Sequence, residues 1–364
     1  MKYYYHPGMQ EPTPPTGGGM PVGQAFFYQP TGVAPVDFAR QWETKEAKKQ
    51  VRKAANGLGA GLLFVQGLGT VLALLLPALI DLLFPGASQN GGLFYEALEY
   101  AVYSPVCILL SMWLGLKIAK GSFSELVPFG KMKPLLWFAC ILFSFAFVFV
   151  GNVIGDIAAV LSPNTAENLT AAMGSEPATL MELVLNVLYV AAIPALVEEL
   201  AFRGIALGLL RKYGDGFAIL ISSLLFGLLH GNLIQIPFAF FVGVVLAYTV
   251  VRTGSIVPAI VIHFINNAMS CILSYYTAEI SSVGESLLFK GLLYGAWAII
   301  GVFGFLLLQF CFAQKPLACI KPYEGCLTLG GRTGAFFSGA ALIVALVVYV
   351  GSAVLFAFPL EMPL

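Results

Sequence analysis

Charged residues are scarce in this chain of 364 residues: 19 are Lys or Arg, 19 are Asp or Glu, and together they make up 10% of the sequence. Soluble domains carry about 25% charged residues. The mean hydropathy of +0.85 and the hydrophobic content of 59% are also far from soluble values. This composition excludes a water-soluble globular protein and indicates a polytopic membrane protein.

The alternating pattern of outer-membrane strands is missing as well, because the apolar runs are long and continuous. A helix crosses a bilayer with roughly 20 apolar residues. Segments of that length, or nearly so, predict an all-α transmembrane bundle of eight or nine spans: 58–84, 94–118, 134–161, 179–210, 216–232, 236–251, 255–276, 288–313 and 334–357. The fifth and sixth are the shortest. At their junction Gly231, Asn232, Gln235 and Pro237 indicate either a tight turn or a broken helix.

Basic residues fall on one predicted side of the membrane. With nine spans and a cytoplasmic N-terminus, the cytoplasmic segments collect 17 of the 19 Lys and Arg residues, leaving Arg203 inside a span and Lys290 outside. The positive-inside rule therefore favours a cytoplasmic N-terminus and an outer C-terminus. We expect a multi-pass protein of a bacterial plasma membrane.

A signal peptide is also lacking, since the first fifty residues contain no apolar core of the required length; the first span would act as an uncleaved anchor. Residues 1 to about 38 are rich in Pro, Gly and aromatics and predict a disordered cytosolic tail. The basic stretch before residue 57 is either a topology anchor or a site for anionic lipid headgroups. We predict four parts: a tail with a basic juxtamembrane segment (1–56), N-terminal helices (57–177), a catalytic helical core (178–277) and C-terminal helices (278–364).

Cysteine is limited to six residues. Four of them are predicted in spans or at span ends, where Cys behaves as a small hydrophobe: Cys107, Cys140, Cys271 and Cys311. Cys319 and Cys326 fall in a predicted cytosolic loop, where a disulfide is not expected. We predict free thiols.

Histidine is rarer still, with three residues, and two of them interrupt apolar segments at His230 and His263. The pair Glu198-Glu199 interrupts a third segment. Each ionisable group in hydrocarbon costs roughly 2.5–3.5 kcal/mol on insertion scales, so such groups indicate a functional site. The first three and last two spans contain almost no internal charge, and we expect them to serve packing.

Helical spacing predicts how these groups are arranged. Glu199 and Arg203 are four residues apart and share a helix face, so they can form an internal ion pair. Glu198 points about 100° away and has no local partner. An unpaired carboxylate at low dielectric holds a proton more readily, as a general base working near neutrality must. A purely structural role, in which both glutamates pair with Arg203, is the alternative.

The depth of each group can be estimated from its distance along the helix. Counted from the cytosolic helix ends, Glu198, His230 and His263 lie at roughly 18, 21 and 13 Å, near the middle of a core of about 30 Å. The three groups can therefore meet. Asn267 follows His263 by four residues, on the same face, and can join them.

Two chemistries fit this set, and both end in hydrolysis of a carbonyl, most simply a peptide bond. Glu198, His230 and His263 could bind a zinc-like ion that activates water. Alternatively Glu198 and His230 activate water directly, while His263 and Asn267 donate hydrogen bonds to the developing oxyanion. The sequence lacks the zinc signature of two histidines four residues apart around a glutamate.

The ordered motifs Glu-Glu-x-x-x-Arg (198–203), Phe-x-x-x-His (226–230) and His-x-x-x-Asn (263–267) resemble those of the CAAX-protease and bacteriocin-processing (CPBP, formerly Abi) family. The resemblance covers roughly residues 180–276. It implies a membrane-embedded, type II CAAX prenyl endopeptidase-like protein, with Glu198 as the water-activating base and His230 beside it. It further implies that His263 and Asn267 complete the site as ligands or oxyanion stabilisers, and that Glu199 and Arg203 support it.

Other functions are less consistent with the pattern. A proton-coupled transporter would use buried Glu, His and Arg, but the chain has no inverted repeat. A non-catalytic immunity or scaffold protein would keep the fold without hydrolysis. A haem-binding histidine pair would leave the Glu-Glu-x-x-x-Arg motif unexplained. As partners we expect a peptide or lipidated protein substrate and membrane lipids, and no nucleic acid.

Overall fold

The computed structural model describes residues 35–87, 92–131, 133–172, 177, 179–277, 282–311 and 320–358. Its contacts divide the chain into two units, Met1–Trp42 and Glu43–Leu364. Most of the predicted disordered tail lies outside the described residues, which begin at Pro35. Helix α1 (Pro35–Leu83) starts in the first unit and includes the basic stretch before residue 57. The other elements belong to the second unit.

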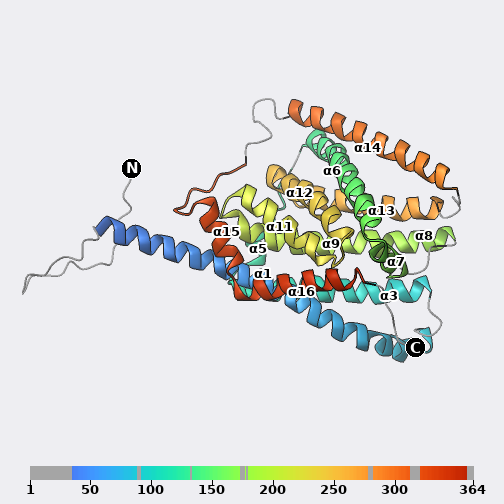
Figure 1. Ribbon diagram of the computed structural model, residues 1–364, viewed down its shortest axis with the longest axis horizontal. Helices are drawn as coiled ribbons and strands as arrows, with labels where there is room; N and C mark the ends of the chain where they lie inside the picture. Colours follow the sequence, from blue (N-terminus) through green and yellow to red (C-terminus); the bar gives the residue numbers. More distant parts are fainter. Residues whose placement is uncertain are drawn as a thin grey trace, which may run out of the picture. The chain divides into compact units, whose positions relative to one another are not determined.

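Within its described residues the second unit is all-helical, as predicted, apart from an isolated bridge between Phe129 and Ser255. Its elements after α1 fall into three groups along the chain (Figure 1). The first contains α3 (Leu93–Ser104), η1 (Pro105–Leu110), α4 (Ser111–Ala119), α5 (Phe123–Leu126), α6 (Pro134–Leu161) and α7 (Pro163–Ala172). The second contains α8 (Leu180–Asn186), η2 (Val187–Ala192), α9 (Ile193–Glu199), η3 (Leu200–Ala206), α10 (Leu207–Arg211), α11 (Asp215–Leu229), α12 (Gln235–Thr253) and α13 (Val257–Thr277). The third contains α14 (Val283–Cys311), α15 (Leu329–Phe337) and α16 (Ala340–Leu355).

The number of spans is lower than nine. Seven helical segments of the described chain are long and apolar enough to cross a membrane, or eight if the pair α15 and α16 counts as one span. That pair covers the predicted span 334–357 but bends by 74°. The predicted span 216–232 is wrong as a full span, because α11 has only 15 residues and reaches roughly 22 Å.

Helix α11 is instead a core helix that returns through a tight turn into α12. Eleven of its fifteen residues are buried, which is the pattern of a helix packed on most sides. Gly231 adopts a positive φ of 63° after α11. Asn232 then caps the next helix: its Oδ1 accepts from the N–H of Gln235 at 2.8 Å, and its Nδ2 donates to Gln235 Oε1 at 2.7 Å. Of the two possibilities at this junction, the structure has the turn.

Contacts between loops follow the alternation of sides that the sequence predicts. We define the basic face by four loop segments: 120–131, 211–215, 252–256 and 320–328. There the N–H of Gly130 donates to the carbonyl of Gly254 at 2.9 Å, and the N–H of Asp215 donates to the carbonyl of Lys321 at 3.1 Å. On the opposite face Lys290 pairs with Asp156 at 3.1 Å. The helix ends therefore sort into two faces, while the cytoplasmic identity of the basic face stays a prediction.

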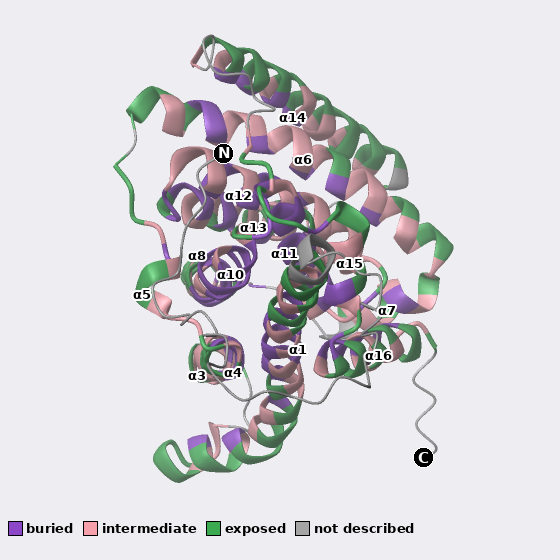
Figure 2. Ribbon diagram, turned by 90° about the vertical axis from the view of Figure 1, so that its left-hand side faces the viewer, coloured by how far each residue is buried: buried purple, intermediate pink, exposed green. Residues whose placement is uncertain are grey.

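Helix α12 lies among the helices that carry the ordered motifs. It packs against α6, α11 and α13, and α6 packs in turn against α14, which runs beside it (Figure 1). Burial follows this arrangement, since 44% of the span in α12 is buried but only 22% of the span in α14. Figure 2 shows the contrast, with buried residues around α10 and α11 and exposed residues along α14. The polar motifs therefore occupy the protein-lined centre.

The described cysteines are free, as predicted. Cys107, Cys140 and Cys271 are buried, Cys311 is half-buried and Cys326 is exposed. Cys319 lies outside the described residues. The short helix α7 follows α6 after one residue, Ser162.

Candidate active site

The two glutamates lie on one long helical segment that is α-helical at its ends and π-helical in two places. It runs from Leu180 to Arg211. A capping box starts it: the Thr179 side chain accepts from the N–H of Glu182, and the Glu182 carboxylate accepts from the N–H of Thr179. Glu198 and Glu199 end α9, between the π-helical segments η2 and η3. Such π-helical turns are frequent at functional sites.

Glu199 links two elements of the site. Its Oε1 accepts from Arg203 Nη1 at 2.9 Å, which confirms the predicted ion pair, and from His263 Nδ1, also at 2.9 Å. Arg203 Nη2 further donates to the carbonyl of Gly243 on α12 at 3.4 Å. All three side chains of this triad are almost fully buried, with Glu199 at 0%, Arg203 at 1% and His263 at 4% exposure. The charges are therefore paired where water cannot screen them.

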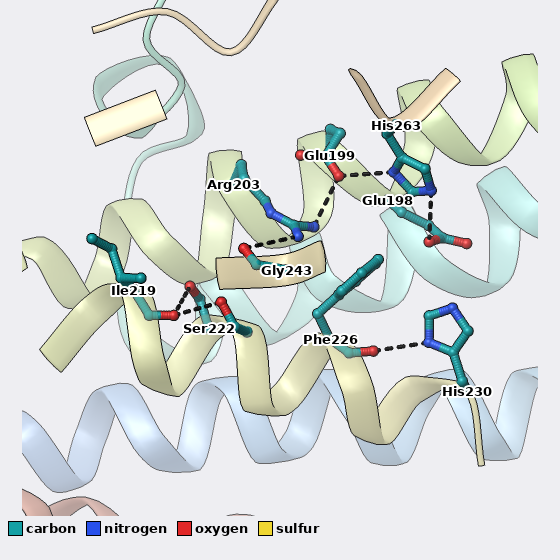
Figure 3. A network of polar contacts seen from close by, with 10 residues as sticks. Glu198, Glu199, Arg203, Ile219, Ser222, Phe226, His230, Gly243 and His263 are labelled. Carbon is teal, nitrogen blue, oxygen red and sulfur yellow. Dashed lines mark hydrogen bonds and ion pairs between the residues drawn. The ribbon is translucent and has the colours of Figure 1, made fainter. Parts of the chain in front are cut away.

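Glu198 does not share this pairing. Its Oε2 lies 3.9 Å from His263 Nε2, on the other side of the imidazole ring from Glu199 (Figure 3). In the structural alternative, both glutamates pair with Arg203. The structure shows a hydrogen bond from Arg203 to Glu199 and none to Glu198, so this alternative is wrong for Glu198. Because Nδ1 of His263 is directed at Glu199, Nε2 is the ring nitrogen available to Glu198.

His230 directly follows the last residue of α11, and one nitrogen of its ring is held by a backbone carbonyl. Its Nδ1 lies 3.0 Å from the carbonyl oxygen of Phe226. A carbonyl oxygen can only accept, so Nδ1 carries the proton in that bond and the Nε2 of a neutral ring keeps a lone pair. This nitrogen can accept a hydrogen bond from water.

Phe226 lies between the polar groups. Its ring packs edge-on against the rings of His230 and His263, with centroids 5.2 and 5.8 Å apart. The guanidinium of Arg203 lies over the same ring, 4.1 Å from the centroid. The phenyl ring thus holds both imidazoles by packing and faces a cation with its negative π surface. The Phe of the Phe-x-x-x-His motif therefore positions the two histidines, a role that the sequence did not indicate.

Four of the predicted residues open onto one cavity of about 560 Å³: Glu198, His230, His263 and Asn267. Glu199 and Arg203 do not line it. The depth estimate predicted that Glu198, His230 and His263 can meet, and all three line this cavity. The arrangement has a buried carboxylate, two imidazoles with defined orientations and a carboxamide around a space that can hold a peptide segment and water.

Residues 180–269 match the family model described as type II CAAX prenyl endopeptidase Rce1-like. The match includes all six residues that we predicted for the site. Residues 180–269 form an Rce1-like domain. It comprises about a quarter of the chain and confirms the resemblance to the CPBP family. At the level of the family the Rce1-like domain is that of a membrane endopeptidase. No curated protein and no solved structure is significantly similar to the chain.

Asn267 joins two parts of the Rce1-like domain. Its Nδ2 donates to the carbonyl of Val190 at 3.3 Å, and its Oδ1 accepts from Asn266 Nδ2 at 3.1 Å. Helix α13 thus supplies a side-chain donor to the backbone of η2.

The cavity also has walls outside the Rce1-like domain. Tyr100 of α3, Asn152 of α6 and Trp297 of α14 line it. The expectation that the first three and last two spans serve packing alone is therefore wrong for these residues. Asn152 is an isolated polar residue in an apolar run, so the sequence could have indicated that it lines a cavity. Nothing in the sequence indicated this for Tyr100 or Trp297.

The donors of the Rce1-like domain do not form a set suited to a metal ion. Among the residues that the structure describes, no group of three His, Cys, Asp or Glu side chains could hold one. Glu198, His230 and His263 line a cavity, but their donor atoms do not converge on one position where a metal ion could bind all three. The mechanism proposed below therefore uses no metal.

Proposed function

We propose that this protein is an intramembrane endopeptidase that hydrolyses peptide bonds of a membrane-associated or lipidated substrate with water activated by Glu198. One observation carries the proposal: the Glu198 carboxylate shares a cavity with the imidazoles of His230 and His263, each held in a definite orientation by another group. Hydrolysis needs a base beside the attacking water and donors beside the carbonyl oxygen.

In this proposal the attacking water lies between Glu198 and His230. The carboxylate takes a proton from the water, and the free Nε2 of His230 accepts the second hydrogen bond and fixes the direction of attack. The bond from Nδ1 of His230 to Phe226 O supports this assignment, because it leaves Nε2 as the acceptor. Glu198 has only 7% exposure and still lines the cavity, so its carboxylate faces the enclosed water and not bulk solvent.

His263 and Asn267 stabilise the oxyanion of the tetrahedral intermediate. A protonated His263 donates from Nε2, while Glu199 binds Nδ1 at 2.9 Å and balances the charge. Asn267, on the next helical turn, supplies the second N–H of its carboxamide, since the first donates to the Val190 carbonyl. Glu199 and Arg203 do not touch the cavity and act as positioning residues. Proton return from Glu198 to the leaving amine completes the reaction.

The cavity fits a peptide that reaches the site within the membrane. Its wall combines polar groups with apolar side chains such as Phe238, Leu273 and Met269. Its volume of about 560 Å³ lies within the range of about 300–1,000 Å³ that is usual for ligand sites. The family description adds that prenylated substrates are a class to test. We place the protein in a bacterial plasma membrane.

Unbiased substrate profiling tests the proposal. Purified protein in lipid nanodiscs is incubated with hydrophobic peptides, with and without a prenyl group, and new peptide termini are identified by mass spectrometry. We expect cleavage by the wild type and none by Glu198→Gln. Equal cleavage by both would overturn the role of Glu198. A wild type that binds peptides but cleaves none would support the scaffold alternative.

A further inference from the structure

The cavity extends in one direction from the reactive groups. His263 is six residues after the start of α13 at the basic face, or roughly 9 Å along the helix, whereas Ser274 is seventeen residues after it, or roughly 26 Å. Both line the cavity. Asn152 is eighteen residues from the start of α6 at the basic face, roughly 27 Å, and also lines it. The cavity thus runs from His263 toward the face opposite the basic loops.

The wall in this direction is polar. Asn152, Gln235, Ser270 and Ser274 line it, and we call these four residues the vestibule. Three of them are half-buried and Ser270 is exposed. Amide and hydroxyl side chains in a membrane-spanning segment face protein or water rather than lipid. The vestibule therefore has the character of a water-accessible entry and not of an opening to the acyl chains.

The opposite direction is closed by the core. Between the reactive groups and the basic face, Phe202, Leu246 and Ile256 have no exposed surface, and Arg203 has 1%. No residue of the described basic-face loops lines the cavity. The loops themselves are joined across this end by the bonds of Gly130 with Gly254 and of Pro128 with Ile256. The described residues thus leave water and peptide no path to Glu198 from this face.

We propose that substrate enters from the face opposite the basic loops, through the vestibule. If the basic face is cytoplasmic, as the positive-inside rule favours, the peptide that is cleaved is presented on the non-cytoplasmic side of the membrane. Among the described lining residues the charged and ionisable groups are Glu198, the two histidines and Tyr100, with no Lys, Arg or Asp. The peptide segment that lies in the vestibule is therefore uncharged, because a charged side chain would lack a partner among its four residues.

This inference rests on the proposed function for the identity of the substrate, but its test does not require activity. Cysteine is introduced at the vestibule as Ser274→Cys and, separately, as Ser270→Cys. Cys326, which is exposed in the basic-face loop, is the internal reference for the opposite side. Ile272→Cys is the matched control on α13, because Ile272 is 41% exposed but does not line the cavity. Wild type gives the background of the other native cysteines.

Intact cells and inside-out vesicles are treated with a membrane-impermeant maleimide, and the labelled cysteine is located by mass spectrometry. We expect at least a fivefold difference in labelling between the two preparations for each vestibule cysteine, with Cys326 showing the reverse preference. Ile272→Cys should stay unlabelled in both. Labelling of the vestibule from the same side as Cys326, or from neither side in a folded protein, would overturn the proposal. Loss of cleavage alone would leave the labelling pattern unchanged and would count against the proposed function only.

Discussion

His263 directs its Nδ1 at Glu199, 2.9 Å away, and this one contact determines which ring nitrogen is left for Glu198 and the cavity. The adjacent glutamates thus have different surroundings. Glu199 pairs with Arg203 and His263 in the core, and Glu198 lines the cavity. The two glutamates have different contacts because neighbouring residues of a helix point about 100° apart.

Glu199→Gln should destabilise the protein and lower activity together. The substitution keeps the shape of the side chain but leaves the guanidinium of Arg203 buried without its anion. Breaking a buried ion pair by removing one partner costs about 3–5 kcal/mol. Thermal unfolding in detergent measures the loss. Asp156→Asn is the control, because it removes a pair with Lys290 in which both side chains are about half exposed, and surface pairs contribute about 0–1 kcal/mol. The asparagine oxygen can still accept the hydrogen bond that Tyr294 O–H donates to Asp156. Equal effects of the two substitutions would contradict the role of the buried pair.

Gly243→Ala should disturb the site through packing. A Cβ at position 243 would lie 3.1 Å from Ser223 Cβ and 3.2 Å from Phe226 Cδ1, so the phenyl ring between the two imidazoles must shift. Overpacking of this kind costs about 1–3 kcal/mol. We expect a lower melting temperature and a lower kcat. Gly295→Ala has open space around its Cβ and should change neither quantity. A Gly243→Ala protein with unchanged kcat would argue against a positioning role for Phe226.

Asn267→Ala should lower kcat more than it changes KM. Removal of one oxyanion donor typically costs about 10²–10³ in kcat. The same substitution removes the bond to the Val190 carbonyl, so the melting temperature must be measured alongside. Asn267→Asp keeps an acceptor but loses the donor and should be as inactive as the alanine variant. Full activity of Asn267→Asp would exclude donation by Asn267 from the mechanism.

Removal of metal ions should leave activity intact. The described donors do not form a group of three that could hold a metal ion, and the proposed water activation uses only Glu198 and His230. Purified protein dialysed against a strong chelator is analysed for zinc and other transition metals and assayed for cleavage. An active preparation with less than about a tenth of an equivalent of metal agrees with the account. Loss of activity that zinc restores would require the metal mechanism.

Local geometry in the sequence predicted much of the site. The i,i+4 spacing predicted the pair of Glu199 with Arg203, and counting residues along helices predicted that Glu198, His230 and His263 lie at one level. Both inferences depend only on the regular rise and turn of a helix.

Longer-range features were not predictable from one sequence. Asn152 and Trp297 line the cavity because of how α6 and α14 pack and rotate, which depends on the side chains of several helices at once. The bond from Asn267 to the Val190 carbonyl joins residues 77 positions apart and depends on how α13 packs against η2. Helix α11 looked like a span because its residues are apolar on most sides, but it ends after 15 residues and is buried in protein.

The central claim is that Glu198 activates the water that cleaves the peptide bond. The most direct measurement is single-turnover cleavage of a profiled substrate by Glu198→Gln in nanodiscs, with melting temperature as the check on folding. The matched control is Glu182→Gln in the same Rce1-like domain, since glutamine can keep the capping box with Thr179. The account predicts a rate at least about 10²-fold below wild type for Glu198→Gln and a wild-type rate for Glu182→Gln. Cleavage by folded Glu198→Gln within about threefold of wild type would contradict it, since that factor is far below the contribution of a general base.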